Sequence, residues 1–432
     1  MSKKYGRYVR GGAPDTRKFD MNKPATEQDD IIAPMVYAFS SVRRMIHKGQ
    51  INKTRMEGVK PPYILLCNHN AFYDFYVMSS ALYPHRGIFP AAVDDYIGRE
   101  AILRKLGAIP KRKYTADVSM LRQCRKALAN GLVFGIYAEA RYSLCGVTEV
   151  IPEAVAQLAK HMKVPVVTFT CRGHHIYDPF WGDHRKRMVI PVVADMTLAY
   201  TPEELKTASV EEINEKIQKL LYNDDFRWQS ENRVKVTYKK RAEGLHKVLY
   251  QCPHCMTEYK MGSKNDKVFC EKCGKSWTLN YYGELVANSG ETEFKFPTDW
   301  YKWEREQVKK EVAAGTYRFE SQVDVNDLPN SKGFVHMGRG TLVHDMDGFH
   351  LKGTREYDNK PFEMELPAAS QYAIHVEYKY RFGNHRDCID FNTLEDTWYV
   401  FPENCDFSVT KISLATEEIF NEIWRKRNQN KK

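Results

Sequence analysis

The sequence has no long hydrophobic run. Its most apolar stretch near the N-terminus, IIAPMVYAF at residues 31–39, is far shorter than the roughly 20 residues that cross a bilayer as a helix. The basic residues at the start of the chain are not followed by an apolar segment of the kind found in secretory signals. We therefore expect neither a membrane-spanning helix nor a secretory signal.

The sequence also lacks the motifs of enzymes that use a nucleophilic side chain. No G-x-S-x-G occurs, and none of the ten cysteines lies in a recognisable catalytic signature. No internal repeat is present. An enzyme without a nucleophile of its own has to activate a group on its substrate instead.

Length and charge narrow the class of protein. At 432 residues the chain is too long for one compact core, which predicts two or three domains. The net charge of +10 favours an anionic partner, either nucleic acid or an anionic membrane surface. Without a secretory signal, the cysteines are expected in the reducing cytosol, as free thiols or metal ligands.

From Pro61 to about Ala199, short apolar strand patterns alternate with helix patterns, which is typical of an α/β fold. Residues 1–27 are polar and basic, and we expect a flexible arm there; residues 28–230 should form the α/β domain. An amphipathic helix is expected at 29–48, either flat on a membrane or packed on its own domain. Further strands are expected at 63–67, 87–93, 132–137 and 164–170, and further helices at 100–107, 119–131, 152–162 and 201–224.

The composition changes beyond this domain. Residues 245–285 hold a group of four cysteines and little apolar mass, as a small zinc ribbon does. Residues 290–432 begin with a helix, continue with β-type alternation over 316–410 and end in a helix with a basic tail. This last part loosely resembles a PH- or GRAM-like small barrel capped by a helix. Membrane docking and a purely structural lid are both consistent with it.

The four cysteines have the spacing of a metal site, C-x2-C-x14-C-x2-C. Each pair can aim two thiolates at one point, and two pairs complete a tetrahedral, all-sulfur site for zinc. Such a site has no open position for water, so the zinc should be structural. It would prop one domain against the next or serve nucleic-acid binding. The expected ligands are Cys252, Cys255, Cys270 and Cys273.

Residues 63–78, YILLCNHNAFYDFYVM, place an imidazole at the end of an apolar strand and a carboxylate five residues later. The strand brings His69 to the edge where α/β folds bind their ligands. Asp74 then lies in the first turn of the next helix. There it can accept a hydrogen bond from one ring nitrogen and leave the other free to take a proton. His69 and Asp74 are therefore candidate catalytic residues that activate a substrate hydroxyl.

The same stretch resembles the first motif of a known family. NHNAFYD is similar to the N-H-x4-D motif of the lysophospholipid acyltransferases, the 1-acyl-glycerol-3-phosphate acyltransferase or PlsC-like family. The resemblance covers roughly residues 30–220, about half of the chain. Three later segments are similar to the further blocks of that family, in the expected order: LGAIPKRK at 106–113, YAEARYS at 137–143 and VPVVTF at 164–169.

The resemblance implies roles for further residues. Arg112 matches the arginine of the second block that holds the acceptor phosphate, and Lys111 adds positive charge where an acid is common in the family. Glu139 and Ser143 match the glutamate and serine of the third block, and Glu139 would orient the acceptor site. The family's Gly-Thr-Arg is Ala-Arg-Tyr here, so Arg141 lies one position away and would reach the phosphate from a different backbone angle.

The implied reaction is direct acyl transfer. His69, oriented by Asp74, would remove the proton from a free hydroxyl of a lysophospholipid, with 1-acylglycerol 3-phosphate as the leading acceptor. That oxygen would attack an acyl thioester of coenzyme A or acyl carrier protein. The resemblance also implies a role in phospholipid biosynthesis and peripheral attachment to an anionic membrane on its cytoplasmic face.

Other interpretations stay open. The acceptor could be glycerol 3-phosphate or another lysolipid. A zinc-ribbon nucleic-acid binder fits the positive charge, but no basic stripe with interleaved aromatic residues supports it. A non-catalytic lipid sensor would not need both members of the His–Asp pair. The remaining histidines of CRGHHIYDPFWGDH are expected to be structural: His174, His175 and His184.

Overall fold

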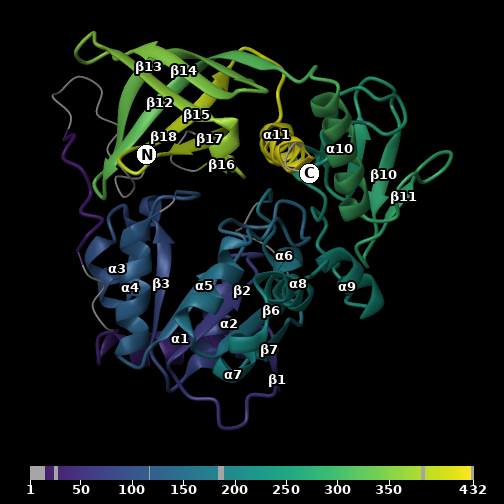
Figure 1. The fold of residues 1–432 in the computed structure, drawn as a ribbon. Coiled ribbons are helices and arrows are strands. Elements are labelled where there is room, and N and C mark those ends of the chain that lie inside the picture. Colours follow the sequence, from purple (N-terminus) through teal and green to yellow (C-terminus); the bar gives the residue numbers. More distant parts are fainter. Residues whose placement is uncertain (1–14, 24–27, 116, 183–188, 381–384, 430–432) are drawn as a thin grey trace.

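The computed structural model describes residues 15–23, 28–115, 117–182, 189–380 and 385–429. Its three β-sheets lie in an N-terminal α/β part, a small middle part and a C-terminal antiparallel part (Figure 1). None of the helices in these residues combines the length and the apolar character needed to cross a membrane. His184 and most of the expected N-terminal arm lie outside the described residues.

The first sheet has seven strands in the order β1-β7-β6-β2-β5-β3-β4. The strands from β6 to β4 run parallel, whereas β7 is antiparallel to β6 and parallel to β1. All five side chains of β2 are buried, as expected for an apolar run inside a parallel sheet. The strands are β1 Gln50–Thr54, β2 Tyr63–Cys67, β3 Gly87–Ala92, β4 Ala108–Lys111, β5 Val133–Tyr137, β6 Val166–Arg172 and β7 Val193–Tyr200.

Helices connect and cover these strands (Figure 1). The helical region expected at 201–224 is present and consists of two helices, because Thr201 and Ser209 each form a capping box and so begin separate helices. The helices are α1 Ile32–Ile46, α2 Tyr73–Leu82, the 3-10 turn η1 Val93–Tyr96, α3 Glu100–Lys105, α4 Val118–Ala129, α5 Ala154–Met162, α6 His174–Tyr177, α7 Pro202–Thr207, α8 Val210–Leu221 and α9 Asp225–Glu231.

The middle part is a four-stranded antiparallel sheet in the order β11-β10-β9-β8. The helix that follows packs against it, since the rings of Trp277 and Trp300 meet edge to face at 4.8 Å between centroids. The elements are η2 Leu245–Lys247, β8 Met261–Lys264, β9 Lys267–Cys270, β10 Ser276–Leu279, β11 Leu285–Ala287 and α10 Pro297–Ala313.

The C-terminal sheet has seven strands in the order β15-β14-β13-β12-β18-β17-β16, all antiparallel. It therefore consists of one meander of four strands and one of three, joined along β12 and β18, with a helix at its end. The elements are β12 Phe319–Asn330, β13 Gly333–Asp345, β14 Gly348–Thr354, β15 Pro361–Pro367, η3 Ala368–Ser370, β16 His375–Tyr380, β17 Arg386–Asn392, β18 Thr397–Glu403 and α11 Val409–Gln429.

The three parts share one hydrophobic core. Buried side chains of the first part (Val77), the middle part (Trp277) and the C-terminal part (Phe349) belong to one contiguous cluster. In Figure 1 the yellow helix α11 lies between the C-terminal sheet and α10. The C-terminal part is thus packed onto the α/β part rather than tethered to it.

The described end of the expected N-terminal arm, residues 15–23, is also packed. Phe19 is buried and meets the ring of Tyr96 at 5.2 Å between centroids. Its backbone N–H donates to the carbonyl of Pro329 in β12 at 2.7 Å. These residues therefore link the α/β part to the C-terminal sheet.

Candidate active site

His69 lies in the loop that follows β2, near the middle of the first sheet. Two asparagines fix this loop to the neighbouring strand β6. The side chain of Asn68 donates to the carbonyl of Cys171 at 2.9 Å and accepts from its N–H at 2.7 Å. Asn70 donates to the same carbonyl at 2.9 Å. The sequence NHN therefore holds the histidine between two anchored residues.

Asp74, in the first turn of α2, contacts the His69 ring as the sequence predicts. Its Oδ2 lies 3.1 Å from His69 Nδ1 and accepts the backbone N–H groups of Asn70 and Ala71 at 2.6 and 3.0 Å. Burial opposes ionisation of Asp74, but hydrogen bonds from His174 and His69 outweigh it and lower its pKa to about 2. We assign the Nδ1–H tautomer to His69 from this network, which leaves Nε2 free to act as a base.

The third sequence block holds the backbone of His69 from both sides. Glu139 Oε1 accepts the His69 N–H at 3.0 Å, and the Ser143 N–H donates to the His69 carbonyl at 2.7 Å. The Ser143 hydroxyl donates to the Val147 carbonyl at 2.7 Å. Burial raises the pKa of Glu139 to about 8. Both residues therefore position the histidine loop.

The His69 side chain is partly accessible, at 15% of its surface. It stacks on Tyr137 with 3.7 Å between ring centroids and contacts Tyr142 at 4.1 Å. Tyr142 in turn contacts Phe180, which meets Tyr378 of β16. Aromatic contacts thus connect the histidine to the C-terminal sheet.

The two basic residues expected to bind the acceptor phosphate at the end of β4 contact other parts of the protein. Lys111 Nζ donates to the Thr115 hydroxyl at 3.0 Å, and burial lowers its pKa to about 8. Arg112 is 3% exposed and donates from Nη1 to the carbonyl of Leu394 at 2.8 Å. Leu394 lies in the turn between β17 and β18, so the C-terminal sheet covers this arginine.

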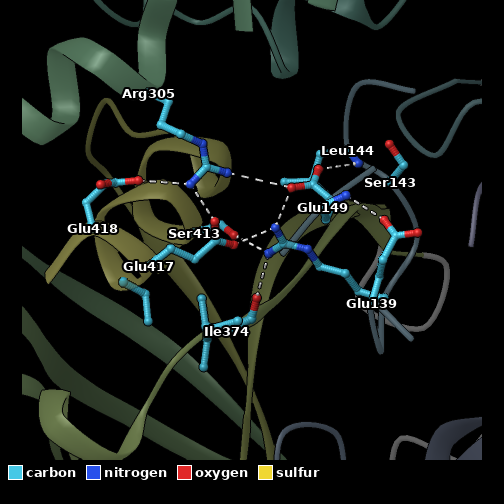
Figure 2. A network of polar contacts seen from close by, with 12 residues as sticks. Glu139, Ser143, Leu144, Glu149, Arg305, Ile374, Ser413, Glu417 and Glu418 are labelled. Atoms are coloured by element: carbon cyan, nitrogen blue, oxygen red, sulfur yellow. Dashed lines mark hydrogen bonds and ion pairs between the residues drawn. The ribbon is translucent and has the colours of Figure 1, made fainter. Parts of the chain in front are cut away.

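Arg141 lies in a buried network that joins three regions of the chain (Figure 2). Its Nη2 donates to Glu149 at 2.8 Å and to Glu417 at 2.5 Å. Its Nη1 donates to Ser413 at 2.6 Å and to the carbonyl of Ile374 at 3.4 Å. Four acceptors therefore match its four Nη hydrogens, three of them from the C-terminal part.

A second arginine completes this network from α10. Arg305 Nη1 lies 2.6 Å from Glu417 and 3.1 Å from Glu418, and its Nη2 lies 3.7 Å from Glu149. Figure 2 shows Arg305 beside Glu149, Glu417 and Glu418. Arg141 and the partly buried Arg305 thus supply two positive charges to three buried carboxylates where the three regions meet.

Sequence reasoning missed a second histidine on Asp74. His174 Nδ1 lies 2.5 Å from Asp74 Oδ1, although only a structural role is expected for it from the sequence. A signal was present, since His174 comes two residues after β6 at the same sheet edge as His69. Its neighbour His175 packs on Trp181 and Phe226 instead. Glu149 carries no comparable signal in the sequence.

The four ribbon cysteines converge as their spacing predicts. Their sulfur atoms all lie within 4.8 Å of one another. The Cys252–Cys273 and Cys255–Cys270 pairs are separated by 3.8 and 3.7 Å. A tetrahedron with Zn–S bonds of about 2.3 Å has S···S edges of about 3.8 Å. The four thiols therefore fit a zinc ion.

Part of the α/β region matches a known family model. A family model described as Acyltransferase matches residues 44–172. A solved structure similar to the chain is the 1-acyl-sn-glycerophosphate (LPA) acyltransferase PlsC from Thermotoga maritima, at 17% identity and a TM-score of 0.34 over 44% of this chain and 76% of that chain. A comparison with curated protein sequences gave no match. The matched segment includes all four sequence blocks, and residues 44–172 therefore carry an acyltransferase domain.

Proposed function

We propose that this protein transfers a fatty acyl group from an acyl thioester to the free hydroxyl of a lysophospholipid, with 1-acylglycerol 3-phosphate as the leading acceptor. The observation that carries the proposal is the His69–Asp74 pair, partly accessible and held by hydrogen bonds inside a domain of the acyltransferase family. Coenzyme A or acyl carrier protein is the proposed carrier of the acyl group.

The proposed reaction uses His69 as a general base. Nε2 takes the proton of the acceptor hydroxyl while the oxygen attacks the thioester carbonyl carbon. The C–O bond forms, the C–S bond breaks, and the leaving thiolate takes the proton back from His69. Asp74 keeps the Nδ1–H in place and stabilises the imidazolium that forms during the transfer.

Arg112 is the proposed ligand of the acceptor phosphate, with Lys111 adding positive charge beside it. The Nε of Arg112 is buried without a hydrogen-bond partner among the described residues. Binding a phosphate there requires the Leu394 turn to move aside. Arg141 already donates to four acceptors of the protein, so we assign it to the contact between the domains. Without Arg141, fewer positive charges are available for a phosphate monoester. A lysolipid with a zwitterionic head group is therefore the second candidate acceptor.

An apolar surface beside the histidine suits a lipid substrate. One face of α1 exposes apolar side chains at helical spacing, each about half exposed or more: Ile31, Met35, Phe39, Val42 and Ile46. Phe39 meets Tyr76 of α2, which meets the half-exposed Phe72. Phe72 lies three residues after His69, so this surface leads toward the catalytic pair.

The surface predicts peripheral membrane attachment, which we propose to be on the cytoplasmic face. Replacing Phe39 and Met35 together by serine should weaken binding to vesicles, because two large side chains no longer leave water. Vesicle sedimentation with and without anionic lipid would measure this, with the exposed Leu394 replaced by serine as the control. Unchanged sedimentation of the double variant would contradict the assignment of this face.

A structural zinc ion is proposed for Cys252, Cys255, Cys270 and Cys273. We expect one zinc per chain by metal analysis of the purified protein. Chelation should remove protection from hydrogen exchange in β8–β10 before it does so in β2, because the metal supplies much of the stability of so small a sheet. A zinc-free protein with the same protection in the ribbon would refute the proposal.

The function is tested by an acceptor panel. Purified protein is offered 1-acylglycerol 3-phosphate, glycerol 3-phosphate or a zwitterionic lysophospholipid, each with acyl-coenzyme A or acyl carrier protein. Products are identified by mass. Faster acylation of the phosphate monoester would support the leading acceptor, and a preference for the zwitterionic lipid would support the second. Transfer to none of these would overturn the proposed function.

A further inference from the structure

His174 bonds the side of Asp74 that faces away from His69. Asp74 Oδ2 serves His69 and two backbone N–H groups, whereas Oδ1 lies 2.5 Å from His174 Nδ1. Both residues are buried. The carboxylate is thus held between two imidazoles that follow different strands, β2 and β6.

The backbone around His174 is held in place by several contacts. Gly173, at the end of β6, has a φ of +82°, where a Cβ would meet the ring of Trp228 at 2.6 Å. Asp225 then accepts the N–H of Gly173 at 2.7 Å and that of His175 at 2.8 Å, which fixes the backbone on both sides of His174. The residue between them has little freedom to leave Asp74.

The other ring nitrogen of His174 indicates its protonation. Nε2 is buried and has no hydrogen-bond partner among the described residues. A buried N–H without a partner costs more than a bare ring nitrogen in apolar surroundings, which places the ring proton on Nδ1 rather than on Nε2. His174 then donates that proton to Asp74.

We infer that His174 is a positioning residue for acyl transfer, which holds Asp74 so that His69 keeps its Nδ1–H tautomer and its place. The inference rests on the proposed function. It gives His174 no contact with either substrate, since the residue acts only through Asp74.

A metal ion is not the explanation for this cluster. Asp74, Cys171 and His174 place their ligand atoms within 4.8 Å of one another. However, the His174 and Asp74 atoms are in direct hydrogen-bond contact, which leaves no space for an ion between them. Burial also raises the pKa of Cys171 well above its usual range, so its thiol keeps its proton.

Several other titratable groups surround the pair and bear on its pH dependence. Cys67 of β2, Tyr137 of β5 and Cys171 of β6 face Asp74, and Tyr142 faces His69. Asp225 of α9 and His47, just after α1, interact electrostatically with His174. Burial raises the pKa of both cysteines and both tyrosines, so these four stay neutral near pH 7.

The test compares His174→Leu, which removes the donor, with His174→Asn, whose amide can replace Nδ1–H. His174→Leu should lower kcat about 10–100-fold with KM unchanged. The acid limb of its pH–rate profile should move to higher pH. The reason is that His174 lowers the pKa of Asp74, so without it the His69–Asp74 pair holds a proton more tightly. His174→Asn should restore most of the rate. His175→Asn, beside it in the core, is the control and should leave the acid limb in place.

Histidine ring-15N labelling gives a readout independent of turnover. The Nδ1–H resonance of His69 should be protected from solvent exchange in wild type and His174→Asn and exposed in His174→Leu. An acid limb that does not move, or equal protection of His69 in His174→Leu, would overturn the inference. A wild-type protein without acyl transfer would refute the proposed function. The labelling experiment would then be the remaining test of whether His174 positions Asp74 and His69.

Discussion

His69→Ala should lower kcat about 10²–10⁴-fold at saturating acceptor and donor, because the variant has no base to take the hydroxyl proton. The fold should survive. The His69 N–H bonds Glu139 and the His69 carbonyl accepts from Ser143, and alanine keeps both backbone groups. Steady-state turnover on the best acceptor of the panel, together with circular dichroism, would measure both effects.

Asp74→Asn should be nearly as damaging, since an amide can hold the His69 ring in the wrong tautomer. His161→Ala is the matched control, because His161 is an exposed histidine of α5 in the same matched domain. A well-folded His69→Ala variant that kept more than about a tenth of wild-type kcat would exclude His69 as the base.

Arg141→Met should destabilise the contact between the domains by about 3–5 kcal/mol, because Glu149 and Glu417 stay buried after one of their two cations is removed. The double variant Arg141→Met with Glu417→Leu should regain part of this loss. It removes one positive and one negative charge and leaves Arg305 with Glu149 and Glu418.

Hydrogen exchange in α10 and α11, together with denaturant unfolding, would measure this loss of stability. Arg425→Met, which breaks an exposed ion pair on the same helix α11, should leave both unchanged. If Arg141 instead binds the acceptor, Arg141→Met would raise KM for phosphate-bearing acceptors and leave α11 as protected as in wild type. That result would return Arg141 to the role that the family resemblance implies.

Local patterns predicted much of the α/β part. The apolar run at 63–67 coincides with β2, and the expected strand at 87–93 differs from β3 by one residue. The short strand β4 at 108–111 was not expected, because four residues with a proline show no clear periodicity. The edge strand β1, QINKT, is polar and mostly exposed, so it carries no apolar pattern either.

The pairing of His69 with Asp74 was predictable because both belong to one strand–loop–helix unit. His174 was harder to predict: its place after β6 was a signal, but its contact with Asp74 spans 100 residues and depends on β6 lying beside β2. The partners of Arg141 were still harder to predict from the sequence. Nothing near residue 141 indicates that its guanidinium bonds a carboxylate 276 residues later.

That separation bears on how the protein is made. Residue 141 leaves the ribosome long before residue 417 is synthesised, so for most of translation the arginine destined for the core lacks one of its two carboxylates. The surface that α11 later covers is also open to other chains during that time. Domains generally fold in order from the N-terminus. Here we expect the acyltransferase domain to mature only after α11 has docked.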